Sequence, residues 1–140
     1  MTNQPGPSTD SNVMAGPIVM FLSAAIFAYF GFFVGLSTTT AAGDTVLMWV
    51  ILLWTLRVGA IMFALAGVLA FASPMSGNVV YAAGSALSAI GLLAVGVMDL
   101  MDDQHAAAIS PVLAFIFAAW NGYGAWASIR EIMASRRAPA

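Results

Sequence analysis

Residues 46–72 read VLMWVILLWTLRVGAIMFALAGVLAFA, an apolar stretch with a single charged residue, Arg57. A helix that crosses the hydrocarbon core of a bilayer needs roughly 20 mainly apolar residues, and this stretch exceeds that length. We therefore predict a transmembrane helix here. Because any window of about 20 residues within the stretch contains Arg57, its guanidinium is predicted to lie inside the span.

The rest of the chain follows the same pattern. Three further apolar stretches predict spans at about residues 17–36, 79–98 and 109–129. Of the 140 residues, 61% are hydrophobic and 7% are charged, and the mean hydropathy is +0.94, which lies outside the usage of soluble domains. The connections are short, so consecutive helices should be antiparallel neighbours. The predicted fold is an all-α membrane protein, an antiparallel bundle of four transmembrane helices.

The two ends of the chain are polar. Residues 1–14 carry no Lys or Arg, which predicts a disordered tail and not a cleaved secretory signal. The four-helix domain would then occupy residues 15–130, with a short basic tail at 131–140. Arg130, Arg136 and Arg137 follow the last span, and positively charged flanks stay in the cytoplasm. With four spans, both termini are predicted to be cytoplasmic.

Small residues mark the helix faces that should pack together, because helices in lipid associate through close backbone approach. At about 100° per residue, one such face recurs on each span. Gly31 and Gly35 form a GxxxG pair on the first span, and Gly84 and Gly91 flank Ser88 on the third. The other members of these faces are Ala24, Ala28, Ala60, Ala64, Gly67, Ala114, Ala118, Asn121 and Ala125.

Arg57 lies one turn before Ala60, on the small-residue face of its span, and is predicted to face the bundle interior. A charge inside a span costs about 2.5–3.5 kcal/mol on insertion scales, so it needs a partner. At the midplane the inward polar residues are Ser88 and Asn121, with Asp99 about 12 Å away, whereas an outward shift of the helix would bring Arg57 to Asp99. The alternatives are a register-fixing bond within the bundle, a counter-charge from a partner or second copy, or an anionic substrate or ion pathway.

Other chemical groups are few. Asp99, Asp102, Asp103 and His105 cluster in one connection and could hold a divalent cation, but their spacing matches no site signature, so solvation and helix capping are expected. We predict no metal site and no cofactor, since no predicted span contains a His for haem and the chain has no Cys. Trp49, Tyr81 and Trp126 fit the aromatic belt at membrane interfaces.

The sequence does not identify an activity, but it limits the classes. No nucleophile is paired with a general base, so an enzyme is not expected, and four cationic residues offer no stripe for nucleic acid. We expect a small integral membrane accessory or structural subunit that packs in the lipid bilayer against other membrane subunits or itself. The alternative is a small oligomeric transporter or channel with a polar site around Arg57.

Overall fold

The computed structural model describes residues 11–34, 38–39, 45–101 and 110–137. This part of the chain is mainly helical, with an isolated antiparallel β-bridge between Thr39 and Thr45. α1 spans Ser11–Ala28 and runs directly into a π-helical turn, η1, at Tyr29–Phe33. α2 spans Leu47–Ala72, α3 spans Pro74–Met101 and α4 spans Pro111–Arg137. All 4 helices are long and apolar enough to cross a membrane, which confirms the helix class and indicates a membrane-embedded protein.

Three helices extend beyond the predicted spans. α3 begins at Pro74 and ends at Met101, outside its predicted span at both ends. α1 begins at Ser11, within the segment predicted to be a disordered tail, and α4 continues through the predicted C-terminal tail to Arg137. The span prediction follows the apolar length that lipid requires, whereas a helix can continue into water over good helix formers. The residues from 130 to 137, REIMASRR, are largely of that kind. Residues 1–10 and 138–140 lie outside the described residues.

Two helices begin with the same serine and proline pair. Ser73 has extended backbone angles (φ −154°, ψ 108°) and separates α2 from Pro74, the first residue of α3. Its hydroxyl accepts a hydrogen bond of 3.3 Å from the backbone N–H of Ser76. Ser110 does the same for α4, accepting 3.3 Å from the N–H of Leu113. Proline cannot continue a preceding helix but suits the first helical position, so each pair sets a sharp helix start.

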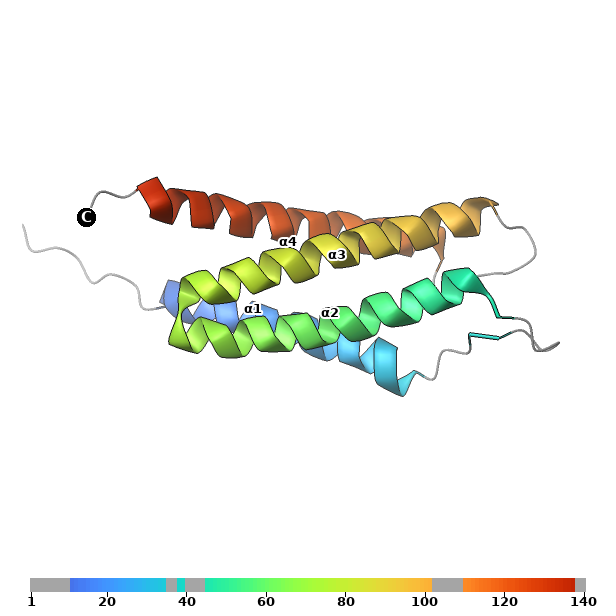
Figure 1. Ribbon diagram of the computed structural model, residues 1–140, viewed down its shortest axis with the longest axis horizontal. Helices are drawn as coiled ribbons and strands as arrows, with labels where there is room; N and C mark the ends of the chain where they lie inside the picture. Colours follow the sequence, from blue (N-terminus) through green and yellow to red (C-terminus); the bar gives the residue numbers. More distant parts are fainter. Residues whose placement is uncertain (1–10, 35–37, 40–44, 102–109, 138–140) are drawn as a thin grey trace, which may run out of the picture.

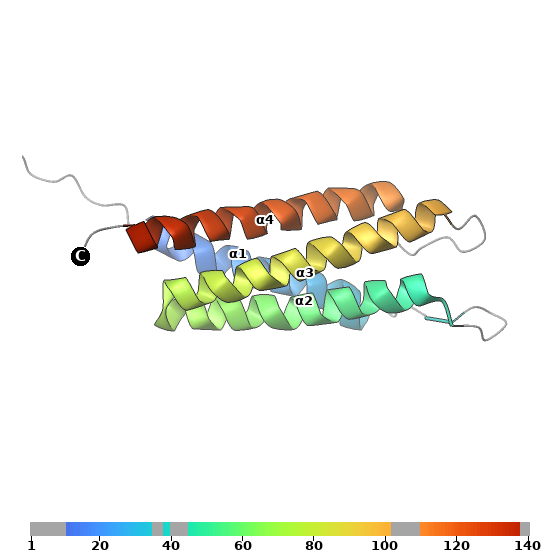
Figure 2. The same ribbon diagram turned by 45° about the horizontal axis from the view of Figure 1, so that its top comes forward.

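The helices form a bundle in chain order. α2 packs against both α1 and α3, and α3 packs against both α2 and α4. Consecutive helices run in opposite directions, so the start of α1 and the end of α4 lie at the same end of the bundle (Figures 1 and 2). In the apolar stretch of each helix, the buried share is 39% for α2 and 44% for α3, but only 22% for α1 and 28% for α4. The hairpin of α2 and α3 is therefore the centre, flanked by α1 and α4.

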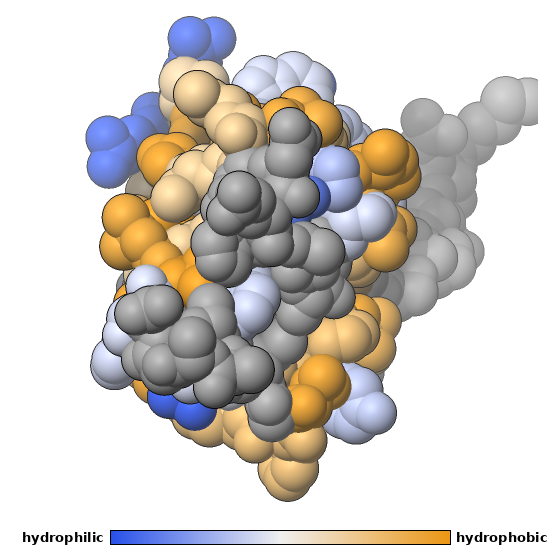
Figure 3. All heavy atoms as spheres, turned by 90° about the vertical axis from the view of Figure 1, so that its right-hand side faces the viewer, coloured by the Kyte–Doolittle hydropathy of each residue, from blue (hydrophilic) through white to orange (hydrophobic). Residues whose placement is uncertain are grey.

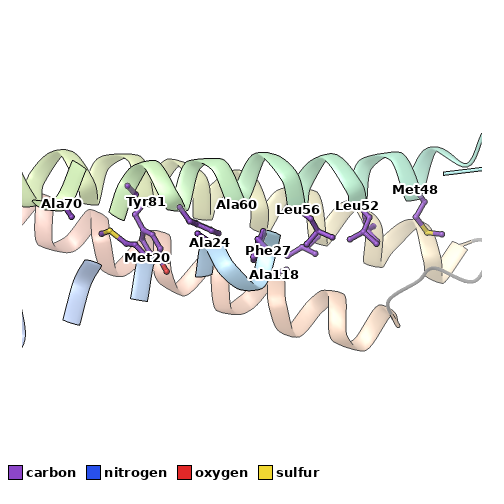
Figure 4. Close-up of a cluster of buried hydrophobic side chains, with 14 of the residues drawn as sticks. Met20, Ala24, Phe27, Met48, Leu52, Leu56, Ala60, Ala70, Tyr81 and Ala118 are labelled. Atoms are coloured by element: carbon purple, nitrogen blue, oxygen red, sulfur yellow. The ribbon is translucent and has the colours of Figure 1, made fainter. Parts of the chain in front are cut away.

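Large apolar side chains fill the interior. Phe63, Leu92 and Val95 are 0%, 1% and 0% exposed. The ring of Phe63 meets Phe27 of α1 edge-on at 5.1 Å and Tyr81 of α3 at 5.2 Å, which joins three helices through one aromatic cluster. Figure 4 shows the α1 side chains in a row along α2; they are Met20, Ala24 and Phe27. Further apolar side chains point outward and occupy much of the rim in the end-on view of Figure 3.

The predicted small-residue face of α4 is confirmed, since all four of its members are buried: Ala114, Ala118, Asn121 and Ala125. Beside the turn that joins α2 to α3, the two backbones come close at Gly77. A Cβ atom there would lie 2.8 Å from the Cα of Ala70 and 2.9 Å from the carbonyl oxygen of Ala66. These are backbone atoms that cannot swing aside, so the hairpin requires glycine at this position.

Gly77→Ala should lower the thermal stability of the protein in detergent. The added methyl group strains the hairpin, and such overpacking typically costs about 1–3 kcal/mol, which outweighs a gain of about 1 kcal/mol in helix propensity. Gly122→Ala is the matched control, because a Cβ at Gly122 meets nothing within 4 Å. The control should melt at the same or a higher temperature. Equal melting of the two variants would contradict the close approach.

Candidate functional site

Arg57 lies part-way along α2, and its side chain reaches the end of the first helix. The residue is half-buried, between Leu56 on the core side and the exposed Val58. Its Nε donates a hydrogen bond of 3.0 Å to the backbone carbonyl oxygen of Gly31 in η1. The guanidinium also lies over the ring of Phe32, 5.3 Å from the ring centre, within the range of a cation–π contact.

The π-helical turn explains why a carbonyl group is available to Arg57. In η1 the hydrogen bonds span one residue more than in an α-helix, and the N–H of Val34 donates 3.1 Å to the carbonyl of Tyr29. The last carbonyls of any helix lack partners within it and carry the negative end of its dipole. A guanidinium placed there satisfies an acceptor and is itself stabilised. The charge of Arg57 is thus balanced at least in part by peptide groups.

Gly31 makes this contact possible. A Cβ on Gly31 would lie 3.2 Å from the backbone nitrogen of Arg57, 3.2 Å from the Cβ of Leu56 and 3.3 Å from the Cγ of Arg57. The close approach brings the carbonyl of Gly31 within reach of Nε. Two residues that the sequence singled out for different reasons, the glycine for packing and the arginine for charge, therefore meet in one site. Gly35, the other half of the GxxxG pair, lies outside the described residues.

The other predicted partners of Arg57 lie elsewhere. Ser88 is buried beside Gly59, with its Oγ 2.8 Å from where a Cβ on Gly59 would be. Asn121 is buried on α4, and its Nδ2 donates 2.8 Å to the carbonyl of Phe117 in its own helix. The hydrogen bond that the structure gives Arg57 within its described part goes to Gly31 instead.

Asp99 is distant from Arg57 along the bundle axis. Across the antiparallel hairpin, Ser88 lies beside Gly59 and Gly91 lies beside Thr55. Continued along both helices, this register makes Asp99 level with the first turn of α2. At about 1.5 Å per residue, roughly 14 Å separates Arg57 and Asp99 along the axis. This distance agrees with the arrangement in which the two residues are too far apart to form an ion pair. Asp102, Asp103 and His105 lie outside the described residues, so the absence of a metal site in that connection stays a prediction.

Two serine hydroxyls form a second polar feature in the interior. Ser85 and Ser88 are 0% and 1% exposed, and their Oγ atoms have no hydrogen-bond partner among the described residues. Ser85 Oγ and Tyr81 Oη lie 3.5 Å and 3.4 Å from where a Cβ on Gly124 of α4 would be. Ser85 and Ser88 lie on the buried face of α3, and Asn121 lies on the buried face of α4. We call Ser85, Ser88 and Asn121 the polar seam.

The sequence singled out Ser88 and Asn121 but missed Ser85, which lies one turn before Ser88 and is equally buried. The spacing of three residues between the serines is a helical repeat and could have found it. The sequence also gave no sign of the Gly31 carbonyl, since a backbone acceptor is present at every residue.

Searches against protein-family models, curated proteins and solved structures find no match to this chain.

Gly31→Leu should loosen the first helix from α2. The larger side chain would collide with the backbone nitrogen of Arg57, which cannot move without bending α2. We expect a lower melting temperature in detergent. Gly16→Leu, on the same helix, is the control, because a Cβ at Gly16 meets nothing within 4 Å. If Gly31→Leu and Gly16→Leu have the same melting temperature, Gly31 is not a packing contact.

Arg57→Leu should leave membrane insertion intact, because it makes the span more apolar, but should release the end of the first helix. Hydrogen exchange of the η1 amides reports this, above all that of Val34, which is bonded to Tyr29. We expect these amides to exchange at least several-fold faster, with little change in the α3 and α4 peptides. Val58→Leu, at the exposed neighbour, is the control. Unchanged exchange at η1 would show that the Arg57 bond does not hold this turn.

Proposed function

We propose that this chain is a small, non-catalytic integral membrane subunit that packs against a larger membrane protein complex. The observation that carries the proposal is that side chains packed against one another fill the interior of the bundle. The outer faces of the helices are therefore the surfaces available for a function. The aromatic cluster around Phe63 and the buried Leu92 and Val95 occupy the centre. Arg57 binds within its own chain, which favours the register-fixing alternative for this residue.

The outer faces of the flanking helices support the proposal. η1 presents Tyr29 and Phe30 in an edge-on pair, with ring centres 5.4 Å apart, and Phe33 is 78% exposed. α4 presents Ile116 and Trp120. Rigid aromatic side chains give large contact areas at little cost in conformational entropy, and they are enriched at the contact points of protein interfaces. Lipid covers whatever part of these faces a partner does not.

The orientation belongs to the same proposal. The start of α1 and the end of α4 share one end of the bundle (Figure 1), and Arg130, Arg136 and Arg137 lie on α4 near that end. Arginine-rich flanks are retained in the cytoplasm. We therefore place both termini on the cytoplasmic side, and the α2–α3 turn at Ser73 with them.

The alternative is a small oligomeric transporter or channel, and the polar seam favours it. Unpaired buried hydroxyls are costly, and in membrane helices polar groups often line a pathway. A pathway beside the packed core would need at least two copies of the chain. The two proposals thus differ in what surrounds the bundle in its native membrane.

Native mass spectrometry after gentle extraction of the tagged full-length chain separates these proposals. We expect foreign subunits at a fixed stoichiometry. A photo-crosslinking amino acid placed at Phe33, or separately at Ile116, should give a protein adduct from at least one position, because both side chains point outward. A homo-oligomer without foreign subunits would favour the transporter. A monomer that crosslinks to lipid alone at both positions would overturn both proposals.

A further inference from the structure

A shallow, open groove of about 480 Å³ lies on the outer side of the last turns of α4, and the residues that line it all belong to this one helix. The residues that line it share one face of the helix, and their side chains change from aromatic to cationic toward the C-terminus. Tyr123 and Trp126 come first, with their ring centres 5.8 Å apart, and Arg130, Met133 and Arg137 follow. The groove therefore passes from aromatic to cationic over about four turns. The core packing and Arg57 do not account for it.

Arg130 is held in a defined place within this groove. Its guanidinium lies over the ring of Trp126, 4.7 Å from the ring centre. A guanidinium over an aromatic ring still has N–H groups to donate, and its planar fork can bind two oxygens of one phosphate. Trp126 therefore positions Arg130 as well as contributing apolar surface.

The acidic side chain beside Arg130 is engaged by another helix. The Oε2 atom of Glu131 accepts a hydrogen bond of 2.9 Å from Nδ2 of Asn78 on α3. This bond ties the carboxylate to α3. Arg137 lies on the same face as Arg130, two turns further and about 10 Å along the helix axis. Two cations and one tied carboxylate leave the groove with a net positive charge.

The groove also lies where α4 changes from apolar to polar. The exposed residues before it include Val112, Ile116 and Trp120, whereas Arg136 and Arg137 end the helix. Tyr and Trp are enriched at the level of lipid headgroups. Arginines just beyond such a belt attract anionic lipids, at about 1 kcal/mol for each charge near the surface.

We propose that this groove binds the headgroup of an anionic phospholipid from the leaflet at the end of the bundle that holds both termini. Arg130 binds the phosphate, Arg137 adds positive charge two turns further along the same face, and an acyl chain runs along Trp126 and Tyr123 toward the apolar part of α4. The charge of the groove favours an anionic lipid over a zwitterionic one. The inference does not rest on the proposed subunit role, because it concerns the lipid bound by this chain alone.

Native mass spectrometry of the full-length chain, titrated with phosphatidylglycerol or phosphatidylcholine in detergent, tests the proposal. We expect one phosphatidylglycerol to bind at least tenfold more tightly than phosphatidylcholine. The double variant Arg130→Gln, Arg137→Gln should lose most of this preference, and Trp126→Leu should weaken it. All three side chains are exposed, so the fold should persist, which circular dichroism of each variant checks.

The control for net charge is Arg136→Gln, compared with Arg130→Gln. Both remove one positive charge, but the described groove is lined by Arg130 and not by Arg136. Arg130→Gln should weaken phosphatidylglycerol binding about tenfold, and Arg136→Gln about twofold or less. Equal effects of the two variants, or equal binding of the two lipids, would overturn the site. So would competition by inorganic phosphate at the lipid concentration, since the occupant would then be a free anion.

Discussion

Close contact between α2 and α3 determines where the other elements can lie. One residue, Ser73, separates the two helices, and the glycine at position 77 lets their backbones meet directly after the turn. With so short a connection the register of the hairpin cannot slip by a turn without breaking the Ser73 cap. That register sets Gly59 against Ser88 and Thr55 against Gly91. α1 then packs on the α2 side and α4 on the α3 side.

Much of this arrangement could be predicted from the sequence. Helices are needed where apolar residues run for the width of a bilayer, because the backbone must satisfy its own hydrogen bonds in lipid. Hydropathy fixes the helix ends less well, since it measures what lipid tolerates. It gave no reason for α4 to continue to Arg137, where the chain keeps its intrahelical bonds after becoming polar. Serine and proline at 73–74 and 110–111, by contrast, mark true helix starts.

The surroundings of Arg57 could be predicted only in part. The small-residue face predicted that Arg57 faces the bundle interior, whereas its side chain is half-buried and reaches η1 at the end of the first helix. Its partner there is a backbone carbonyl in a π-helical turn, which side-chain patterns do not reveal. The distance to Asp99 depended on the hairpin register. The sequence left that register open because the apolar stretch at 46–72 is longer than a bilayer requires.

Two arginines in this chain lie over aromatic rings, yet they differ in what their charge can still do. Arg57 is half-buried above Phe32 and bonded to the end of the first helix, so its charge helps to hold two helices together. Arg130 is exposed above Trp126, and the neighbouring Glu131 is bonded to Asn78 of α3. A buried charge that lost its acceptor would destabilise the bundle, whereas an exposed one can exchange water for a phosphate at little cost. The difference in burial therefore makes Arg57 a structural residue and leaves Arg130 available to a ligand.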